Sequence, residues 1–321
     1  MVGGDCLVGA VETLLLNAHE NEIKGDQRSD DQHKEEDETR CADDPDLRLR
    51  TLPGDSFLAE LDLQHLEKFL RFLLAVGIGL QGKHFILAHE IMKPASSVPH
   101  RHKLIAYVAP MALFLALLAL GSGLKAIGGS FWLSSPEYWI FPAQAILCAG
   151  LVWWFRREYD FGKLRQPVFV LAVGLAVFVL WVSPQMFFGF APRTEGFNPN
   201  LFANQPPLYW LTITLRFLRL VIVVPLMEEI FWRGFLLRYL IDDKFYAVPF
   251  GKFSAFSFWS VSAAFALAHS MPDWIAAFIT GMAYNAVAYR TKSLTSCIVV
   301  HAVTNLLLGL WIMCTQQWGF W

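Results

Sequence analysis

The feature that most constrains this chain is a series of apolar runs, beginning near residue 104, that are long enough or nearly long enough to cross a lipid bilayer. A membrane-spanning helix needs about 20 predominantly apolar residues. The runs cover residues 104–124, 138–155, 168–188, 208–240, 253–271, 274–289 and 294–315 of a chain of 321, in which 55% of residues are hydrophobic. We therefore predict an all-α fold, a polytopic transmembrane helical bundle of about seven to eight spans.

Basic residues in the loops between these runs indicate the orientation of the chain in the membrane. Arg216 and Arg219 interrupt the longest run, which suggests an interfacial helix over 208–218 that leads into a spanning helix. Excess Lys and Arg mark the side that is not translocated. We therefore expect an integral membrane protein with a cytoplasmic N-terminus, in the cell inner membrane if the source is bacterial. The loops on the other side carry only Lys125 and Arg193. The segments on the expected cytoplasmic side carry Arg101, Lys103, Arg156, Arg157, Lys163, Arg165, Lys244, Lys252, Arg290 and Lys292.

Residues 1–102 have a different character, because they hold 19 of the 28 acidic residues and seven of the nine histidines. The stretch 19–50 has almost no apolar side chain to bury, so ordering it would cost entropy with little return. The apolar piece 72–80 is too short to span a membrane. We predict a largely disordered acidic extension over 1–102 and a membrane domain over 103–321, with Met92 as an alternative natural start.

The five cysteines are widely spaced and include no CxxC pair, which argues against a disulfide framework and against a thiolate zinc site. We expect Cys148, Cys297 and Cys314, in the membrane domain, to fill apolar space.

The membrane domain contains a few ionisable side chains within its apolar runs, where they are costly unless paired or used. Glu228 and Glu229 lie in one run, and His269 and His301 in two others. Residues four apart share a helix face, so we expect Glu229 to pair with Arg233, Phe265 to lie beside His269, and Asn305 to extend the surface of His301. Glu228 is turned about 100° from Glu229 and is left available.

Each of these residues alone has a structural interpretation, since histidine and asparagine commonly join membrane helices by hydrogen bonds. Together, an unpaired carboxylate, two imidazoles and a carboxamide on three helices are the groups needed to activate a water molecule and to stabilise an oxyanion.

Three motifs resemble the signature of the CPBP, or Abi, family of intramembrane proteases, which includes the CAAX prenyl endopeptidases of type 2 and bacteriocin-processing proteins. These are EEIFWR (228–233), FALAH (265–269) and HAVTN (301–305), in the family's order, and the resemblance covers about 206–309. It implies an endopeptidase in which Glu228 activates a water that His269 helps to hold. It also implies that His301 and Asn305 form the oxyanion hole, with Glu229 and Arg233 as a brace and Phe265 as further support.

The resemblance favours catalysis without a metal or other cofactor, although zinc bound by Glu228, His269 and His301 is the alternative. The expected partners are a membrane-associated protein or peptide substrate and the lipid bilayer, with no nucleic acid. One difficulty is that the predicted spans place His269 and His301 about 15 Å apart in depth. A non-catalytic scaffold or immunity protein of the same family is the second interpretation, and a carrier or proton relay is the third.

Overall fold

The computed structural model describes residues 98–321, and the predictions for the acidic extension, for residues 72–80 and for Met92 lie outside that range. Within it the chain forms helices and no strand. The main ones are α5 (Val98–Ile127), α7 (Glu137–Trp154), α8 (Pro167–Phe187), α12 (Ala255–Leu267), α13 (Trp274–Thr291), α14 (Leu294–Thr315) and a long helix over Pro206–Tyr239 that comprises α9 to α11. Single turns occur at α6 (Phe131–Ser134), η1 (Pro199–Phe202), η4 (Phe245–Ala247), η5 (Met271–Asp273) and η6 (Trp318–Phe320). The predicted all-α fold is confirmed, with one main helix for each apolar run.

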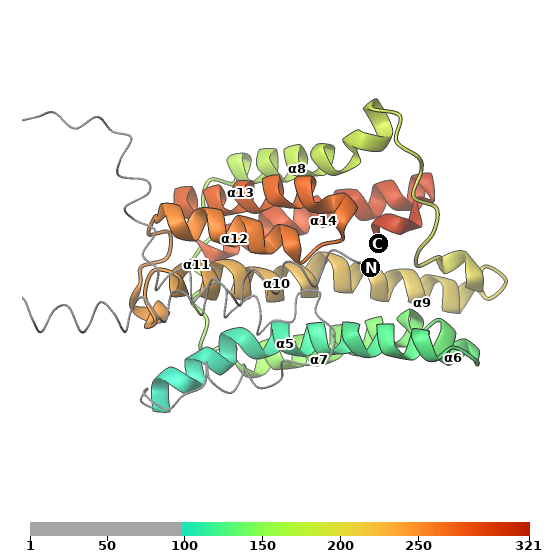
Figure 1. Ribbon diagram of the computed structural model, residues 1–321, viewed down its shortest axis with the longest axis horizontal. Helices are drawn as coiled ribbons and strands as arrows, with labels where there is room; N and C mark the ends of the chain where they lie inside the picture. The colour runs from blue at the N-terminus through green and yellow to red at the C-terminus, as the bar shows by residue number, and fades with distance from the viewer. Residues whose placement is uncertain (1–97) are drawn as a thin grey trace, which may run out of the picture. The chain divides into compact units, whose positions relative to one another are not determined.

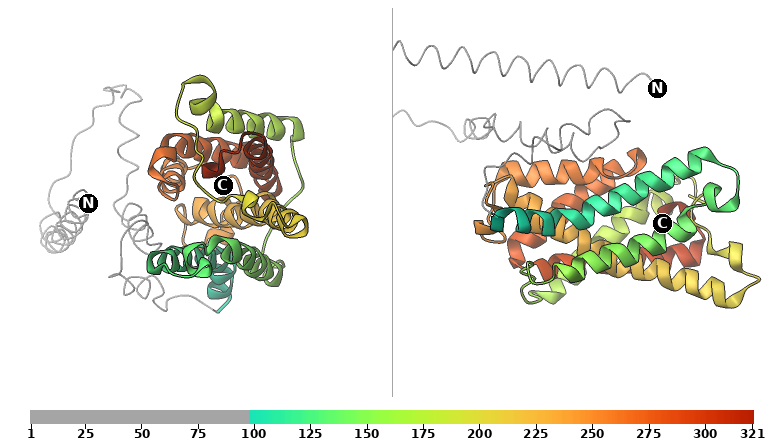
Figure 2. Two further views of the ribbon diagram at one scale, coloured as in Figure 1. Left: turned by 90° about the vertical axis from the view of Figure 1, so that its right-hand side faces the viewer. Right: turned by 90° about the horizontal axis from the view of Figure 1, so that it is seen from below.

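The main helices of this part of the chain run side by side as a bundle (Figures 1 and 2). α5 packs against α7, α8 against α14, and α12 against α13. α14 also contacts α13 and the long helix, so the two helices that carry EEIFWR and HAVTN are direct neighbours.

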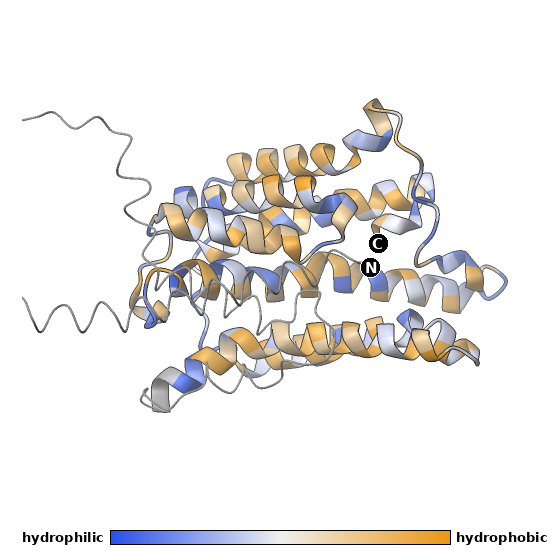
Figure 3. Ribbon diagram, in the orientation of Figure 1, coloured by the Kyte–Doolittle hydropathy of each residue, from blue (hydrophilic) through white to orange (hydrophobic). Residues whose placement is uncertain are grey.

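Four helices are long and apolar enough to cross a membrane by length and composition: Arg101–Ile127, Pro167–Phe187, Pro206–Tyr239 and Leu294–Thr315. α8 shows how such a helix faces lipid. Its residues Val168, Leu171, Leu175 and Val179 are 42 to 80% exposed, which would be unfavourable against water but suits hydrocarbon. Figure 3 shows the same hydrophobic character along α8. The protein is an integral membrane protein.

The long helix differs from the prediction of a separate interfacial helix over 208–218, because it continues without a break from Pro206 to Tyr239. It contains α9 (Pro206–Phe217), α10 (Val224–Glu229) and α11 (Leu237–Tyr239). Between them lie two stretches with i→i+5 hydrogen bonds, η2 (Leu218–Val223) and η3 (Ile230–Leu236). Such π-helical stretches are often found at functional sites.

The α13–α14 connection is short because both helix ends are capped. Lys292 adopts a left-handed conformation at the end of α13, and the Ser293 side chain accepts a hydrogen bond from the Ser296 amide at the start of α14. Ser293 Oγ also donates to the Lys163 carbonyl at 2.7 Å, which ties this connection to the α7–α8 loop. Of the cysteines expected to fill apolar space, Cys148 and Cys297 are buried, but Cys314 is exposed and does not fill the core.

The contact between α8 and α14 depends on Gly174. A Cβ atom there would lie 2.9 Å from Val303 Cγ1 and 3.1 Å from the Val300 carbonyl oxygen. We predict that Gly174→Val lowers the free energy of unfolding by about 1–3 kcal/mol through overpacking. The matched control is Gly150→Val on α7, where an added Cβ meets nothing within 4 Å. Thermal unfolding in detergent measures both, and equal melting temperatures would contradict the close packing.

Candidate active site

Glu229 and Arg233 form a fully buried ion pair on the long helix. Arg233 Nη1 donates to Glu229 Oε1 at 2.9 Å, and both side chains are 0% exposed. The i,i+4 spacing places both groups on one face of the helix, as the sequence predicted.

Arg233 also binds α13, the neighbouring helix. Its Nε donates to Asn285 Oδ1 at 3.2 Å and its Nη2 to the Gly281 carbonyl at 3.3 Å. The amide of Asn285 in turn donates to Ser262 Oγ on α12 at 3.1 Å. The guanidinium of Arg233 therefore links three helices, and each of its nitrogens has a partner.

His301 of α14 completes this buried network. Its Nδ1 lies 2.9 Å from Glu229 Oε1. A carboxylate can only accept a hydrogen bond, so Nδ1 carries the proton and Nε2 is free to interact with a ligand. Glu229 Oε1 thus receives both Arg233 and His301, while its Oε2 is buried without a partner among the described residues.

His269 lies two residues beyond the end of α12. Its Nδ1 is 2.7 Å from the Phe265 carbonyl oxygen, and the two rings are 4.7 Å apart. The predicted proximity of Phe265 and His269 is confirmed. The Trp181 ring lies 5.6 Å from the imidazole on another side. Because the carbonyl accepts, Nδ1 is the donor here too, which leaves Nε2 as an acceptor in the neutral ring.

Asn305 lies one turn after His301, half-buried, and bonds the long helix. Its Nδ2 donates to the Leu220 carbonyl oxygen at 2.9 Å. This carbonyl lies in the π-helical stretch, where the Val224 amide donates to the Arg219 carbonyl. The next bond in that register would need an amide hydrogen at Pro225, which proline lacks. Asn305 therefore satisfies a carbonyl that the helix leaves open, and it still has its second N–H available.

Glu228 is half-buried, and its carboxylate makes no hydrogen bond or ion pair with residues 98–321. It does interact electrostatically with the Arg219 guanidinium. The structure thus pairs Glu229 with Arg233 and leaves Glu228 without a hydrogen-bond partner, as the helical period predicted.

The two histidines do not form a compact metal site with Glu228. Their rings are connected through two aromatic side chains, with centroid distances of 4.7 Å from His269 to Phe265, 6.4 Å from Phe265 to Tyr284 and 5.2 Å from Tyr284 to His301. No three His, Cys, Asp or Glu side chains in the described part of the chain are grouped to hold a metal ion. The zinc alternative, with Glu228, His269 and His301 as ligands, stays a prediction that metal analysis tests.

Comparison with known proteins agrees with the motifs. Residues 210–307 match the family model described as type II CAAX prenyl endopeptidase Rce1-like. The predicted family resemblance is confirmed. No curated protein and no solved structure matches the chain. The Rce1-like segment contains all seven residues selected from the three motifs.

The sequence prediction missed Asn285 in this Rce1-like segment. It is fully buried and positions the guanidinium of Arg233. A signal was available, because Asn285 is a polar residue within the apolar run 274–289, and such residues commonly join membrane helices.

The network predicts a large stability effect at Arg233. In Arg233→Ala the Glu229 carboxylate would stay buried without its guanidinium, which we expect to lower the free energy of unfolding by about 3–5 kcal/mol. The matched control is Arg157→Ala, which removes an exposed arginine. Thermal unfolding and the yield of folded protein measure the effect. Wild-type stability in Arg233→Ala would show that the pair does not brace the helices.

Proposed function

We propose that this protein is an intramembrane endopeptidase that hydrolyses a peptide bond of a membrane-associated protein or peptide by glutamate-activated water. The observation that carries the proposal is that the two adjacent glutamates have different surroundings. Glu229 is neutralised by Arg233 and bonded to His301, while Glu228 has a carboxylate without a hydrogen-bond partner among residues 98–321. A general base needs such a free carboxylate within reach of water.

Glu228 would take a proton from a water molecule, whose oxygen attacks the scissile carbonyl carbon. The same proton then passes to the leaving amine, so that water is consumed and the carboxylate is regenerated. His269 supports this step, because its Nδ1 is engaged by the Phe265 carbonyl and its Nε2 can accept the second hydrogen of the water.

The negative charge that develops on the carbonyl oxygen requires donors. Asn305 has an N–H that Leu220 does not use. His301 is oriented by the Glu229 carboxylate at its Nδ1, and its Nε2 donates to the oxyanion when the ring carries a proton on both nitrogens. These donors are fixed by the helices before the reaction, which is the condition for effective oxyanion stabilisation.

The family description names a CAAX prenyl endopeptidase, so a peptide with a prenylated cysteine near its C-terminus is the first substrate to assay. The excess of Lys and Arg at the start of α5 and in alternate loops supports a cytoplasmic N-terminus for α5.

The first prediction for this function concerns Glu228. Glu228→Gln keeps the size of the side chain and removes the base, so we expect turnover of a farnesylated peptide to fall by about 10²–10⁴-fold. The melting temperature should remain unchanged. The matched control is Glu195→Gln, which changes an exposed glutamate. Undiminished peptide cleavage by Glu228→Gln, measured by mass spectrometry, would end the general-base assignment. Absence of cleavage in the wild type, with every substrate tested, would favour a non-catalytic member of the family.

The second prediction separates metal-free catalysis from catalysis by zinc. Without a metal, Asn305 is one of few donors to the oxyanion, so Asn305→Ala should reduce turnover by about 10²–10³-fold. Activity should also survive exhaustive chelation. The control is Asn204→Ala, which changes an exposed asparagine. Stoichiometric zinc by elemental analysis, together with near-normal activity of Asn305→Ala, would show that zinc does the polarising.

A further inference from the structure

Two buried arginines on the long helix have unusual surroundings. Arg216 is 3% exposed and Arg219 is 7% exposed. Neither forms a salt bridge with a carboxylate of residues 98–321. The Arg216 guanidinium makes no hydrogen bond to the described residues, and its Nε and Nη1 are buried donors without partners. Such donors are costly in a protein interior, and more so inside a membrane.

Aromatic rings surround the two guanidinium groups. The Phe141 ring lies 4.6 Å from Arg216 and 4.4 Å from Arg219, and the rings of Phe197 and Trp321 lie 5.0 and 5.2 Å from Arg216. Cation–π contacts offset part of the desolvation of a cation, but they provide no acceptor for its N–H groups. Arg219 Nε has an acceptor, because it donates to Gln144 Oε1 at 2.7 Å, so the missing part of this site is an acceptor for Arg216.

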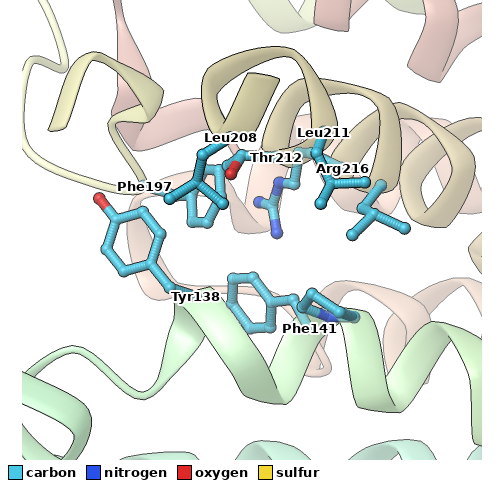
Figure 4. Close-up of a pocket in the computed structure, with 9 residues that line it drawn as sticks. Tyr138, Phe141, Phe197, Leu208, Leu211, Thr212 and Arg216 are labelled. Atoms are coloured by element: carbon cyan, nitrogen blue, oxygen red, sulfur yellow. The ribbon is translucent and has the colours of Figure 1, made fainter. Parts of the chain in front are cut away.

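A pocket of about 130 Å³ leads to Arg216 between α7 and α9. Figure 4 shows the guanidinium pointing into it, between the rings of Phe141 and Phe197. The other side chains that line it are Tyr138, Pro142, Leu208, Leu211, Thr212 and Leu215. An apolar wall with a single buried cation fits an anionic group attached to an apolar or peptide chain.

Glu137, in the first turn of α7, pairs with Lys125 Nζ at 3.7 Å and also interacts electrostatically with Arg216, but it makes no salt bridge or hydrogen bond with that guanidinium. Arg219 interacts electrostatically with Glu228. Both arginines lie on the same helix as Glu228, nine and twelve residues before it. At 1.5 Å per residue these separations are about 14 and 18 Å along the axis.

We propose that Arg216, with the cation of Arg219 beside it, forms a subsite for a free carboxylate, the C-terminal carboxylate of the substrate peptide. This proposal rests on the function proposed above. An extended chain covers about 3.3 Å per residue, so the carboxylate would lie about four to five residues beyond the bond that Glu228 hydrolyses. A carboxylate matches the planar guanidinium edge of arginine. The guanidinium would then have a hydrogen-bond acceptor, and the buried carboxylate would have a cationic partner.

The test compares two farnesylated peptides with four residues after the farnesylated cysteine, one with a free C-terminal carboxylate and one with a C-terminal amide. Binding is measured to the Glu228→Gln protein in nanodiscs of neutral lipid, so that no hydrolysis interferes. We expect this protein to bind the acid at least about tenfold more tightly than the amide. Adding Arg216→Gln should abolish this preference and leave amide binding unchanged, whereas the exposed control Arg157→Gln should keep it.

In the active protein, Arg216→Gln should raise the KM for the peptide with a free carboxylate and change kcat little, because the subsite binds the substrate away from the reacting atoms. Arg216→Gln should not lower the melting temperature, since it removes an unpaired buried charge. If this variant does not fold, Leu211→Trp narrows the pocket from a position that is 52% exposed and leaves both arginines in place. It should also reduce the preference for the acid.

Equal binding of acid and amide would overturn the proposal. A preference for the acid that persists in the variants would overturn it too. Competition by an anionic phospholipid, without any preference for the acid peptide, would instead assign the site to a lipid phosphate. These outcomes concern binding, so they remain distinct from failure of the proposed peptidase, which would show as absent cleavage despite normal binding.

Discussion

The buried carboxylate of Glu229 is the point on which the candidate site depends. A charge in a membrane protein interior requires a partner, and Glu229 has two, Arg233 on its own helix and His301 on α14. Arg233 extends the same network to α13 through Asn285 and Gly281. One ionic contact thereby fixes the rotation of the long helix relative to two neighbours. This fixed rotation determines the direction in which the Glu228 side of the long helix faces.

The π-helical stretches of the long helix contribute to the same geometry. They flank α10, which carries both glutamates, and they change the hydrogen-bond register on either side of it. Pro225 removes one amide donor, and Asn305 of α14 supplies the missing hydrogen bond to the Leu220 carbonyl. A local irregularity in one helix is therefore stabilised by a side chain that we assign to the oxyanion hole, so the fold and the proposed chemistry share this residue.

Much of the fold followed from the sequence, because the length of an apolar run and the 3.6-residue period are local properties. They predicted one helix per run, the Glu229–Arg233 pair and the proximity of Phe265 to His269. Other features depend on contacts between helices, such as the role of Asn285 and the continuity of the long helix through Arg216 and Arg219. The sequence also predicted a depth difference between His269 and His301, and in the structure a series of ring contacts through Phe265 and Tyr284 connects the two imidazoles.

The charges of the long helix form a consistent arrangement when they are taken together. Between residues 216 and 233 it carries three arginines and two glutamates. Arg233 neutralises Glu229, and Arg219 interacts electrostatically with Glu228, whose carboxylate makes no hydrogen bond with the described residues. Arg216 interacts electrostatically with Glu137, but its guanidinium has no salt bridge or hydrogen bond with the described residues. In a low-dielectric interior an excess positive charge attracts an anion over several ångströms. A substrate that brought its own carboxylate into the membrane would supply that anion, and each charge would reduce the desolvation cost of the other.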